Sequence, residues 1–342
     1  MIRSALVVGA GLAGLVAAQR LAAAGIRVTV FDKGRGPGGR MATRREGDAC
    51  WDHGAQFFTA RDPRFAEMVA RWTREGVATR WDRAAGPAVV DRLPRARGVP
   101  TMSALGRYLS RGLDVRLASP IEAVLCGDDE GIDRPGCDGP WRARPALQGV
   151  AGAVEGAAEF AAQAMVLTAP VPQSLALLDA GGVVLADTDR AMLERIAYDP
   201  CLALLATLDG PSRLPPPGAL EPAAGPLGWI ADNHAKGVSP VPTATIHATA
   251  AWSTENWERD RNTVAGELLR AALPLLGVGV KEWRLHAWRY ARPTVLHDTP
   301  CLLVRAPRRL VFAGDAFVAP RVEGAALSGL AAADALLQEN AP

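Results

Sequence analysis

The chain has 342 residues, which is about two domains on the usual range of domain sizes. Nearly half of them are apolar (49%), enough for a sizeable core, and the formal net charge is only +2. The basic residues are scattered rather than clustered, which argues against nucleic-acid binding. No apolar run reaches the roughly 18 residues of a transmembrane helix, and arginines interrupt the apolar N-terminal stretch. We therefore expect neither a membrane span nor a secretory signal.

The cysteines bear on the redox compartment. Their number is odd, and no two stand in a CxxC pair, which argues against both a disulfide framework and a zinc site. This pattern fits a reducing cytoplasm, and we expect no metal. The five are Cys50, Cys126, Cys137, Cys201 and Cys301.

The N-terminal segment predicts a strand, a helix and a second strand. Ala5–Val8 is an apolar run, Gly11–Ala24 has helical character and ends before Gly25, and Arg27–Phe31 alternates as a strand does. This βαβ unit is the smallest piece of a parallel α/β sheet.

The remaining elements follow in chain order. Residues 127–158 are rich in Gly, Asp, Pro and Ala and predict a hairpin or loop, in which Trp141 anchors one strand. Residues 164–168 predict a strand, 208–226 a loop, 246–290 short strands alternating with helices, 309–313 a buried strand, and 324–338 a helix. The two ends of the chain are thus α/β in character, with a mixed α+β insertion between them.

The turn after the first strand carries a nucleotide-binding pattern, GxGxxG, from Gly9 to Gly14. Gly9 permits the tight turn, Gly11 lets the backbone approach a pyrophosphate at the helix N-terminus, and Gly14 lets helix and strand pack closely. Asp32, at the end of the second strand, can accept hydrogen bonds from ribose hydroxyls. The residues between the glycines, Leu12 and Ala13, are also expected at the cofactor.

A second glycine pair follows the acid and distinguishes FAD from NAD. Gly38 and Gly39 permit close approach of the backbone, and the Arg40 guanidinium suits a pyrophosphate. Simple NAD dehydrogenases do not need this second anchor. Lys33 and Met41, which flank it, are expected to contact the cofactor as well.

The segments GGRMATRR and DHGAQFFTARDPRF resemble the renalase branch of the flavin amine oxidase superfamily. The resemblance implies a Rossmann-type FAD-binding domain in which the second segment passes beside the flavin ring. The alternative interpretation of His53 is a hydrogen-bonded structural histidine. The alternative for Phe57 and for Phe58 is packing in the core. The residues implied to contact flavin or substrate are Gly54, Ala55, Gln56 and Phe57.

The C-terminal part adds a third element of this resemblance. Gly314-Asp315 follows a predicted buried strand, as in the flavoprotein motif whose Asp binds the ribityl or pyrophosphate portion. The next helix could stabilise negative charge that develops on a reduced flavin. No cysteine lies near it, so we expect FAD to be bound non-covalently. Further implied contacts are Ile121, Gly324, Ala325 and Leu327.

The predicted FAD-binding domain is discontinuous and comprises residues 1–80, 101–172 and 303–342. Residues 81–100 and 173–302 form the predicted substrate domain. A flat heteroaromatic substrate on a flavin favours aromatic walls; tryptophans on strands are otherwise core or interface residues. The substrate-side and catalytic candidates are Gln56, Phe57, Trp229, His247, Trp288 and Tyr290.

The resemblance implies oxidation of dihydro-NAD(P) isomers, reduced at the 2 or 6 position, to NAD(P)+. Hydride passes to flavin N5, and O2 as acceptor yields H2O2. An amine oxidase is the first alternative. Some amine oxidases use a lysine that holds a water near N5, and only Lys236 and Lys281 could serve, since Lys33 adjoins the ribose acid. A flavin-binding scaffold with little turnover is the second alternative.

Overall fold

The computed structural model describes residues 2–81, 93–127, 140–146, 160–304, 307 and 309–339. These residues form two compact units. Unit 1 comprises residues 1–39, 106–197 and 293–342, and unit 2 comprises residues 40–105 and 198–292. Each unit is described by itself.

Unit 1 is built on a six-stranded sheet of order β17-β18-β11-β1-β2-β7. All neighbouring pairs are parallel except β17 with β18. The predicted α/β class with a Rossmann-like sheet is therefore confirmed. The strands are β1 (Ser4–Val8), β2 (Arg27–Phe31), β7 (Asp114–Arg116), β11 (Ala164–Leu167), β17 (Leu302–Leu303) and β18 (Leu310–Phe312).

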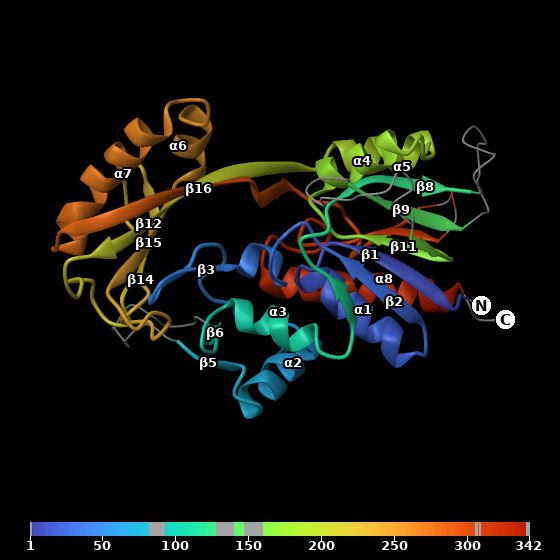
Figure 1. The fold of residues 1–342 in the computed structure, drawn as a ribbon, viewed down its shortest axis with the longest axis horizontal. Coiled ribbons are helices and arrows are strands. Elements are labelled where there is room, and N and C mark those ends of the chain that lie inside the picture. Colours follow the sequence, from blue (N-terminus) through green and yellow to red (C-terminus); the bar gives the residue numbers. More distant parts are fainter. Residues whose placement is uncertain are drawn as a thin grey trace, which may run out of the picture. The chain divides into compact units, whose positions relative to one another are not determined.

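Two long helices pack together on one face of this sheet (Figure 1). They are α1 (Leu12–Ala23) and α8 (Val322–Gln338). A Cβ at Gly329 would collide with the carbonyl oxygen of Ala13, so only glycine permits this close approach. The C-terminal helix is thereby fixed beside the helix that follows the glycine-rich turn.

The other elements of unit 1 include an antiparallel three-stranded sheet, β10-β9-β8. Trp141 is buried in β9, which confirms the predicted anchor of one strand; the rest of 127–158 falls mostly outside the described residues. The elements are β8 (Ile121–Cys126), β9 (Trp141–Pro145), β10 (Phe160–Ala162), α4 (Val171–Ala180) and α5 (Asp187–Glu194).

Cys126, the last residue of β8, is disulfide-bonded. The expectation of a chain without disulfides is therefore wrong. An odd cysteine count leaves room for a pair, and spacing along the chain does not show which thiols meet in the fold. Cys50, Cys201 and Cys301 are free thiols. The reducing compartment stays a prediction.

Unit 2 is built on a five-stranded antiparallel sheet of order β13-β14-β15-β12-β16. Residues 280–295 form one strand of 16 residues, where short runs were expected, because its alternating polar and apolar residues continue without a turn signal. The strands are β12 (Ala197–Leu208), β13 (Ala219–Leu220), β14 (Leu227–Asp232), β15 (Thr243–Ala248) and β16 (Val280–Val295).

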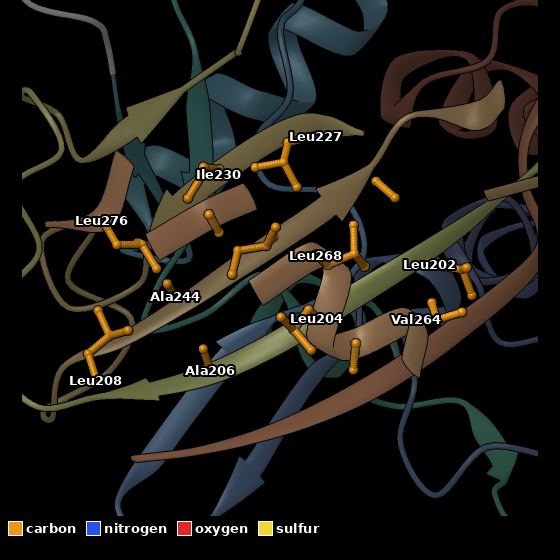
Figure 2. Close-up of a cluster of buried hydrophobic side chains, with 14 of the residues drawn as sticks. Leu202, Leu204, Ala206, Leu208, Leu227, Ile230, Ala244, Val264, Leu268 and Leu276 are labelled. Carbon is orange, nitrogen blue, oxygen red and sulfur yellow. The ribbon is translucent and has the colours of Figure 1, made fainter. Parts of the chain in front are cut away.

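One face of this sheet is covered by α6 (Ala250–Glu255) and α7 (Arg261–Leu276). Figure 2 shows the apolar core between them, where Val264, Leu268 and Leu276 from α7 meet Leu204 and Ile230 from the sheet. Strand residues alternate between the two faces, so the neighbours of these core residues point the other way.

The opposite face packs against a hairpin of β3 (Thr43–Glu46) and β4 (Ala49–Asp52), where Trp51 meets Leu205 of β12. Phe58 is buried beside Phe65 and Trp72 of α2, so the alternative of core packing holds for Phe58. The remaining elements are the 3-10 helix η1 (Gly39–Met41), α2 (Pro63–Arg74), β5 (Ala78–Arg80), β6 (Ala96–Gly98) and α3 (Ser103–Leu109).

The two units divide the chain at other positions than the predicted domains. Residues 40–80 group with unit 2 because β4 packs on β15, and residues 173–197 group with unit 1 because α4 packs on β8. Assignment of FAD to one set of residues stays a prediction. No helix of the described residues is long and apolar enough to cross a membrane.

Candidate functional site

The glycine-rich turn of unit 1 has the conformation its sequence predicts. Gly9 has a φ of +112°, which side chains rarely permit. A Cβ at Gly14 would collide with the carbonyl oxygen of Gly9 and approach Val7 of β1 to 3.1 Å. The first and third glycines therefore fix the turn and the packing of α1 against β1, while Leu12 and Ala13 are buried in the first turn of α1.

Gly11 is under a different constraint. A Cβ built there meets nothing within 4 Å, and its φ is an ordinary −72°. The second glycine pair lies directly beside it: the Gly38 N–H donates to the carbonyl of Ala10 at 2.8 Å, and a Cβ at Gly39 would stand 3.2 Å from the Gly11 Cα. Open space beside Gly11, at the start of a helix, is what close approach of a pyrophosphate requires.

Asp32 lies at the end of β2 and closes this turn. Its Oδ2 accepts from the Ala10 N–H and its Oδ1 from the Gly34 N–H, both at 2.7 Å. A carboxylate has about four acceptor sites, so these bonds leave capacity for ribose hydroxyls. The neighbouring side chain of Lys33 is exposed. The residues present therefore fit an adenine dinucleotide.

The C-terminal candidates also lie in unit 1. Gly314 has a φ of +146°, and its N–H donates to the Ser328 hydroxyl of α8 at 2.8 Å, which ties the Gly314-Asp315 turn to that helix. A Cβ at Gly324 would collide with the Ala319 carbonyl oxygen. Ala325 and the buried Leu327 follow it in α8, and half-buried Ile121 begins β8.

In unit 2, side chains on one face of β15 bind the backbone of residues 50–53. These residues lead into the segment that resembles a flavin-contact loop. The Thr243 hydroxyl donates to Cys50 O and the Thr245 hydroxyl to Asp52 O, each at 2.9 Å. His247 Nε2 lies 3.1 Å from His53 O and must carry the proton, because a carbonyl only accepts. Three alternate residues of one strand thus hold three carbonyls of the segment from Cys50 to His53.

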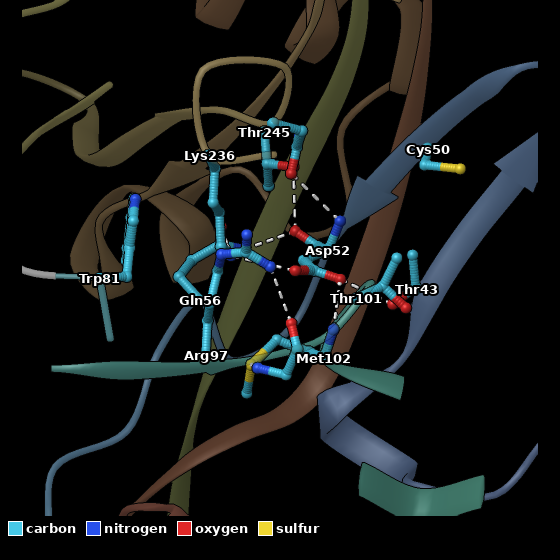
Figure 3. A network of polar contacts seen from close by, with 12 residues as sticks. Thr43, Cys50, Asp52, Gln56, Trp81, Arg97, Thr101, Met102, Lys236 and Thr245 are labelled. Carbon is cyan, nitrogen blue, oxygen red and sulfur yellow. Dashed lines mark hydrogen bonds and ion pairs between the residues drawn. The ribbon is translucent and has the colours of Figure 1, made fainter. Parts of the chain in front are cut away.

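Gln56 lies within the same network (Figure 3). Its Nε2 donates to the carbonyls of Asp52 and Gly54, and its Oε1 lies 3.4 Å from Lys236 Nζ. The side chain is buried. Its amide is thus bonded within its own loop, and contact with flavin or substrate stays a prediction. The backbone N–H of Asp52 donates to Asn233 Oδ1 at 3.2 Å.

Besides the network around Gln56, unit 2 contains a cluster formed by His53, His247 and Trp288. The Trp288 indole N–H donates to His53 O at 2.9 Å, and the two rings stack with centroids 5.3 Å apart. His286 contacts both rings edge-on. Burial lowers the pKa of His53 and of His247 to about 4, so both are neutral at neutral pH. The His53 ring is packed against the rings of Trp288 and His286.

Phe57 and Trp229 meet in a third cluster, the aromatic wall of Phe57, Trp81, Trp229 and Arg95. The centroids of Phe57 and Trp229 are 5.5 Å apart, and Trp81 lies 6.2 Å and 6.4 Å from them. The Arg95 guanidinium lies 4.1 Å from the Phe57 centroid and 5.5 Å from that of Trp229. This wall combines flat apolar surfaces with a positive charge.

Two further candidates occupy other surroundings. Arg40 Nη1 donates to the carbonyls of Tyr290 and Ala291 at 3.3 Å, while Ala55 N–H donates to Arg40 O at 2.8 Å. A Cβ at Gly54 would collide with that same Arg40 carbonyl. The Tyr290 ring packs on Tyr198 instead of joining Trp229 or Trp288. The adjoining Met41 is buried.

Sequence reasoning missed several residues of this site. Asp52 stood in the quoted motif, but nothing marked it as buried. Thr245 carries no motif, and alternation along β15 was its only signal. Asn233 directly follows β14, and nothing in the sequence marked its side chain as a partner of Asp52. Arg95, which lies over the Phe57 ring, belongs to no recognised sequence motif.

Comparisons with known proteins bear on the nucleotide turn first. Residues 7–72 match the family model of an NAD(P)-binding Rossmann-like domain. Over 63 residues the chain is 36% identical to protoporphyrinogen oxidase 2, chloroplastic/mitochondrial, from Arabidopsis thaliana. That match covers 18% of this chain and only 12% of the length of that protein.

Solved structures are similar over the whole chain. A protein of Exiguobacterium sp. 255-15, provisionally assigned as a protoporphyrinogen oxidase, superposes with a TM-score of 0.72 at 12% identity, covering 98% of this chain and 99% of that one. A putrescine oxidase bound to putrescine gives 0.70 at 13%, with the same coverage. A fatty acid isomerase from P. acnes gives 0.67 at 12%, covering 98% of each chain. These likenesses establish the fold.

Proposed function

We propose that the chain is an FAD-dependent oxidoreductase that oxidises dihydro-NAD(P) isomers, reduced at the 2 or 6 position of the nicotinamide, to NAD(P)+. The observation that carries the cofactor assignment is the turn in which Gly11, backed by Gly39, faces open space at the start of α1. Asp32 would bind the adenosine ribose, and the Gly314-Asp315 turn the ribityl or pyrophosphate portion. FAD is proposed to be held without a covalent bond.

Bound FAD would supply the hydride acceptor, and O2 would reoxidise it. The net reaction would convert the dihydronicotinamide, O2 and a proton into NAD(P)+ and H2O2. The protein's own residues would align the substrate. The aromatic wall offers flat surfaces to a heteroaromatic ring, and Arg95 a positive charge to its phosphates. His53 and His247 are neutral, so this cluster brings no positive charge to repel a nicotinamidium product.

The choice of dihydronicotinamide rests on the DHGAQFFTARDPRF resemblance, and an amine oxidase is the alternative. Putrescine oxidase has the same fold. One observation disfavours that alternative: Lys236 is wholly buried and bonded to Asp52, so it does not offer an accessible amine to a water. Lys281 is exposed on β16.

The test is anaerobic reduction of the flavin by one reductant at a time. We expect borohydride-derived dihydro-NAD isomers to bleach the long-wavelength flavin band quickly, and normal NADH and a panel of amines to bleach it slowly. Rapid bleaching by amines alone would replace the substrate assignment. Bleaching by no reductant would favour a scaffold.

A matched pair of variants tests the aromatic wall. Trp229→Leu should raise the KM for the isomer, because it removes the ring against Arg95 and Phe57. Trp252→Leu, on the helix-covered side of the same sheet, should leave the KM unchanged. Equal effects of the two would remove the wall from substrate binding.

A further inference from the structure

Lys236 follows β14 and is one of three lysines in the chain. Its side chain and that of Asp52 are both fully buried, with Nζ 3.0 Å from Asp52 Oδ2. A buried ammonium is costly unless it is paired and hydrogen-bonded. Burial lowers the pKa of Lys236, and the Asp52 carboxylate opposes that shift. A protein keeps such a pair only where its surroundings complete the bonding.

Asp52 and Lys236 each have further polar partners besides one another. Asp52 Oδ1 accepts from the Thr43 hydroxyl at 2.6 Å and from the Met102 N–H at 3.1 Å. Lys236 Nζ also reaches Gln56 Oε1 at 3.4 Å and lies 5.0 Å from the centroid of the Trp81 ring. Figure 3 shows Thr43, Met102 and Lys236 around Asp52, each from a different strand or loop.

The Gln56 amide lies between the Lys236 ammonium and two backbone carbonyls, which require the same orientation of it. An ammonium only donates, so the oxygen of Gln56 must face it. The amide nitrogen then points at the carbonyls of Asp52 and Gly54. The two carbonyls only accept, so they favour the same orientation, and the ammonium adds a charge-assisted bond to it. Lys236 thus strengthens the orientation of Gln56 that cross-links the loop between Asp52 and Phe57.

The first part of that loop, residues 52–55, is held at most of its backbone polar groups. The Asp52 N–H and carbonyl bind Asn233 and Thr245, and the His53 carbonyl accepts from His247 and Trp288. The N–H groups of His53 and Ala55 donate to the carbonyls of Ala42 and Arg40. The Lys236–Asp52 pair lies inside this cage, and the Arg97 guanidinium is a second positive charge that acts on both of its members.

We propose that Lys236 is a positioning residue, which through Asp52 and Gln56 fixes the 52–57 segment in the shape that meets flavin and substrate. That the segment meets a flavin rests on the proposed function; that Lys236 fixes its shape does not. Lys236 is then no water-holding amine of an oxidase, and Asp52 no catalytic base.

Amide hydrogen exchange of the flavin-free protein tests the positioning role directly. Lys236→Met should raise exchange across 53–57 by about tenfold or more, as expected for loss of a charged hydrogen bond. Exchange in α7 should stay unchanged. Lys281→Met, at an exposed lysine of β16, is the matched control and should change neither segment.

Should Lys236→Met fail to fold because it leaves Asp52 unpaired, the double variant Asp52→Asn with Lys236→Met removes both charges. It should fold and still exchange faster across 53–57. Wild-type exchange there in either folded variant would overturn the proposal.

FAD binding provides the second readout. We expect Lys236→Met to weaken FAD binding about tenfold and to change the shape of the flavin absorption band. The opposite outcome is a variant that loses flavin reduction while its exchange, FAD affinity and flavin spectrum stay as in the wild type. That result would place the Lys236 amine at the reacting atoms and overturn the proposal. Because exchange is measured without flavin, its outcome does not depend on the proposed function.

Discussion

The indole N–H of Trp288 donates to the backbone carbonyl of His53 at 2.9 Å, while its ring stacks on the histidine. Trp288→Phe keeps the stack and removes the bond. We expect the free energy of unfolding to fall by about 1 kcal/mol, since His247 still serves that carbonyl. The measurement is denaturant unfolding of this variant and of a control, Trp283→Phe. Trp283 lies in the same strand but packs against the core under α6 and α7. Equal losses would show that the bond contributes nothing.

The nucleotide turn gives a sharper contrast. Gly11→Ala should leave the melting temperature unchanged, because its Cβ meets nothing, yet abolish FAD binding by filling the space for the pyrophosphate. Gly36→Ala, also unobstructed, should retain FAD. Gly14→Ala should destabilise the protein itself, since its Cβ collides with Gly9. The checks are thermal denaturation and FAD titration; undiminished affinity in Gly11→Ala would place the cofactor elsewhere.

Acid should destabilise unit 2 through its histidines. The pKa of His247 is about 4 in the folded chain, below its ordinary 6.5, because burial disfavours the charged ring. The unfolded chain therefore binds more protons between these values, and stability is lost as pH falls from about 6.5 towards about 4. His247→Gln keeps a donor for His53 and does not titrate. Its stability should fall less steeply over this window, and a slope equal to the wild type would refute this origin.

The thiols make a separate prediction. Burial raises the pKa of Cys201 to about 12 and that of Cys301 to about 11, so both remain protonated near neutral pH. Only the thiolate alkylates readily. We expect iodoacetamide to leave Cys201 unmodified until the protein is denatured, and to modify Cys126 only after reduction. Labelling of Cys126 without a reductant would contradict its disulfide.

Motif chemistry made the nucleotide turn predictable, because Gly9, Gly11, Gly14 and Asp32 lie within one βαβ unit whose spacing fixes their contacts. The substrate side was less accessible. Trp229, Trp288 and Tyr290 look alike in sequence, yet they lie in three different clusters. Which ring meets which depends on the register between strands far apart in the chain, where no tight turn fixes the pairing.

Cofactor release tests the central claim most directly. Purified protein, supplied with FAD and freed of excess, is denatured in acid, and the supernatant is analysed by mass and absorbance. We predict intact FAD in an amount equal to that of the chain, with no flavin left on the precipitate. A protein that neither carries nor takes up flavin would contradict the account, and flavin remaining on the denatured chain would contradict the non-covalent site.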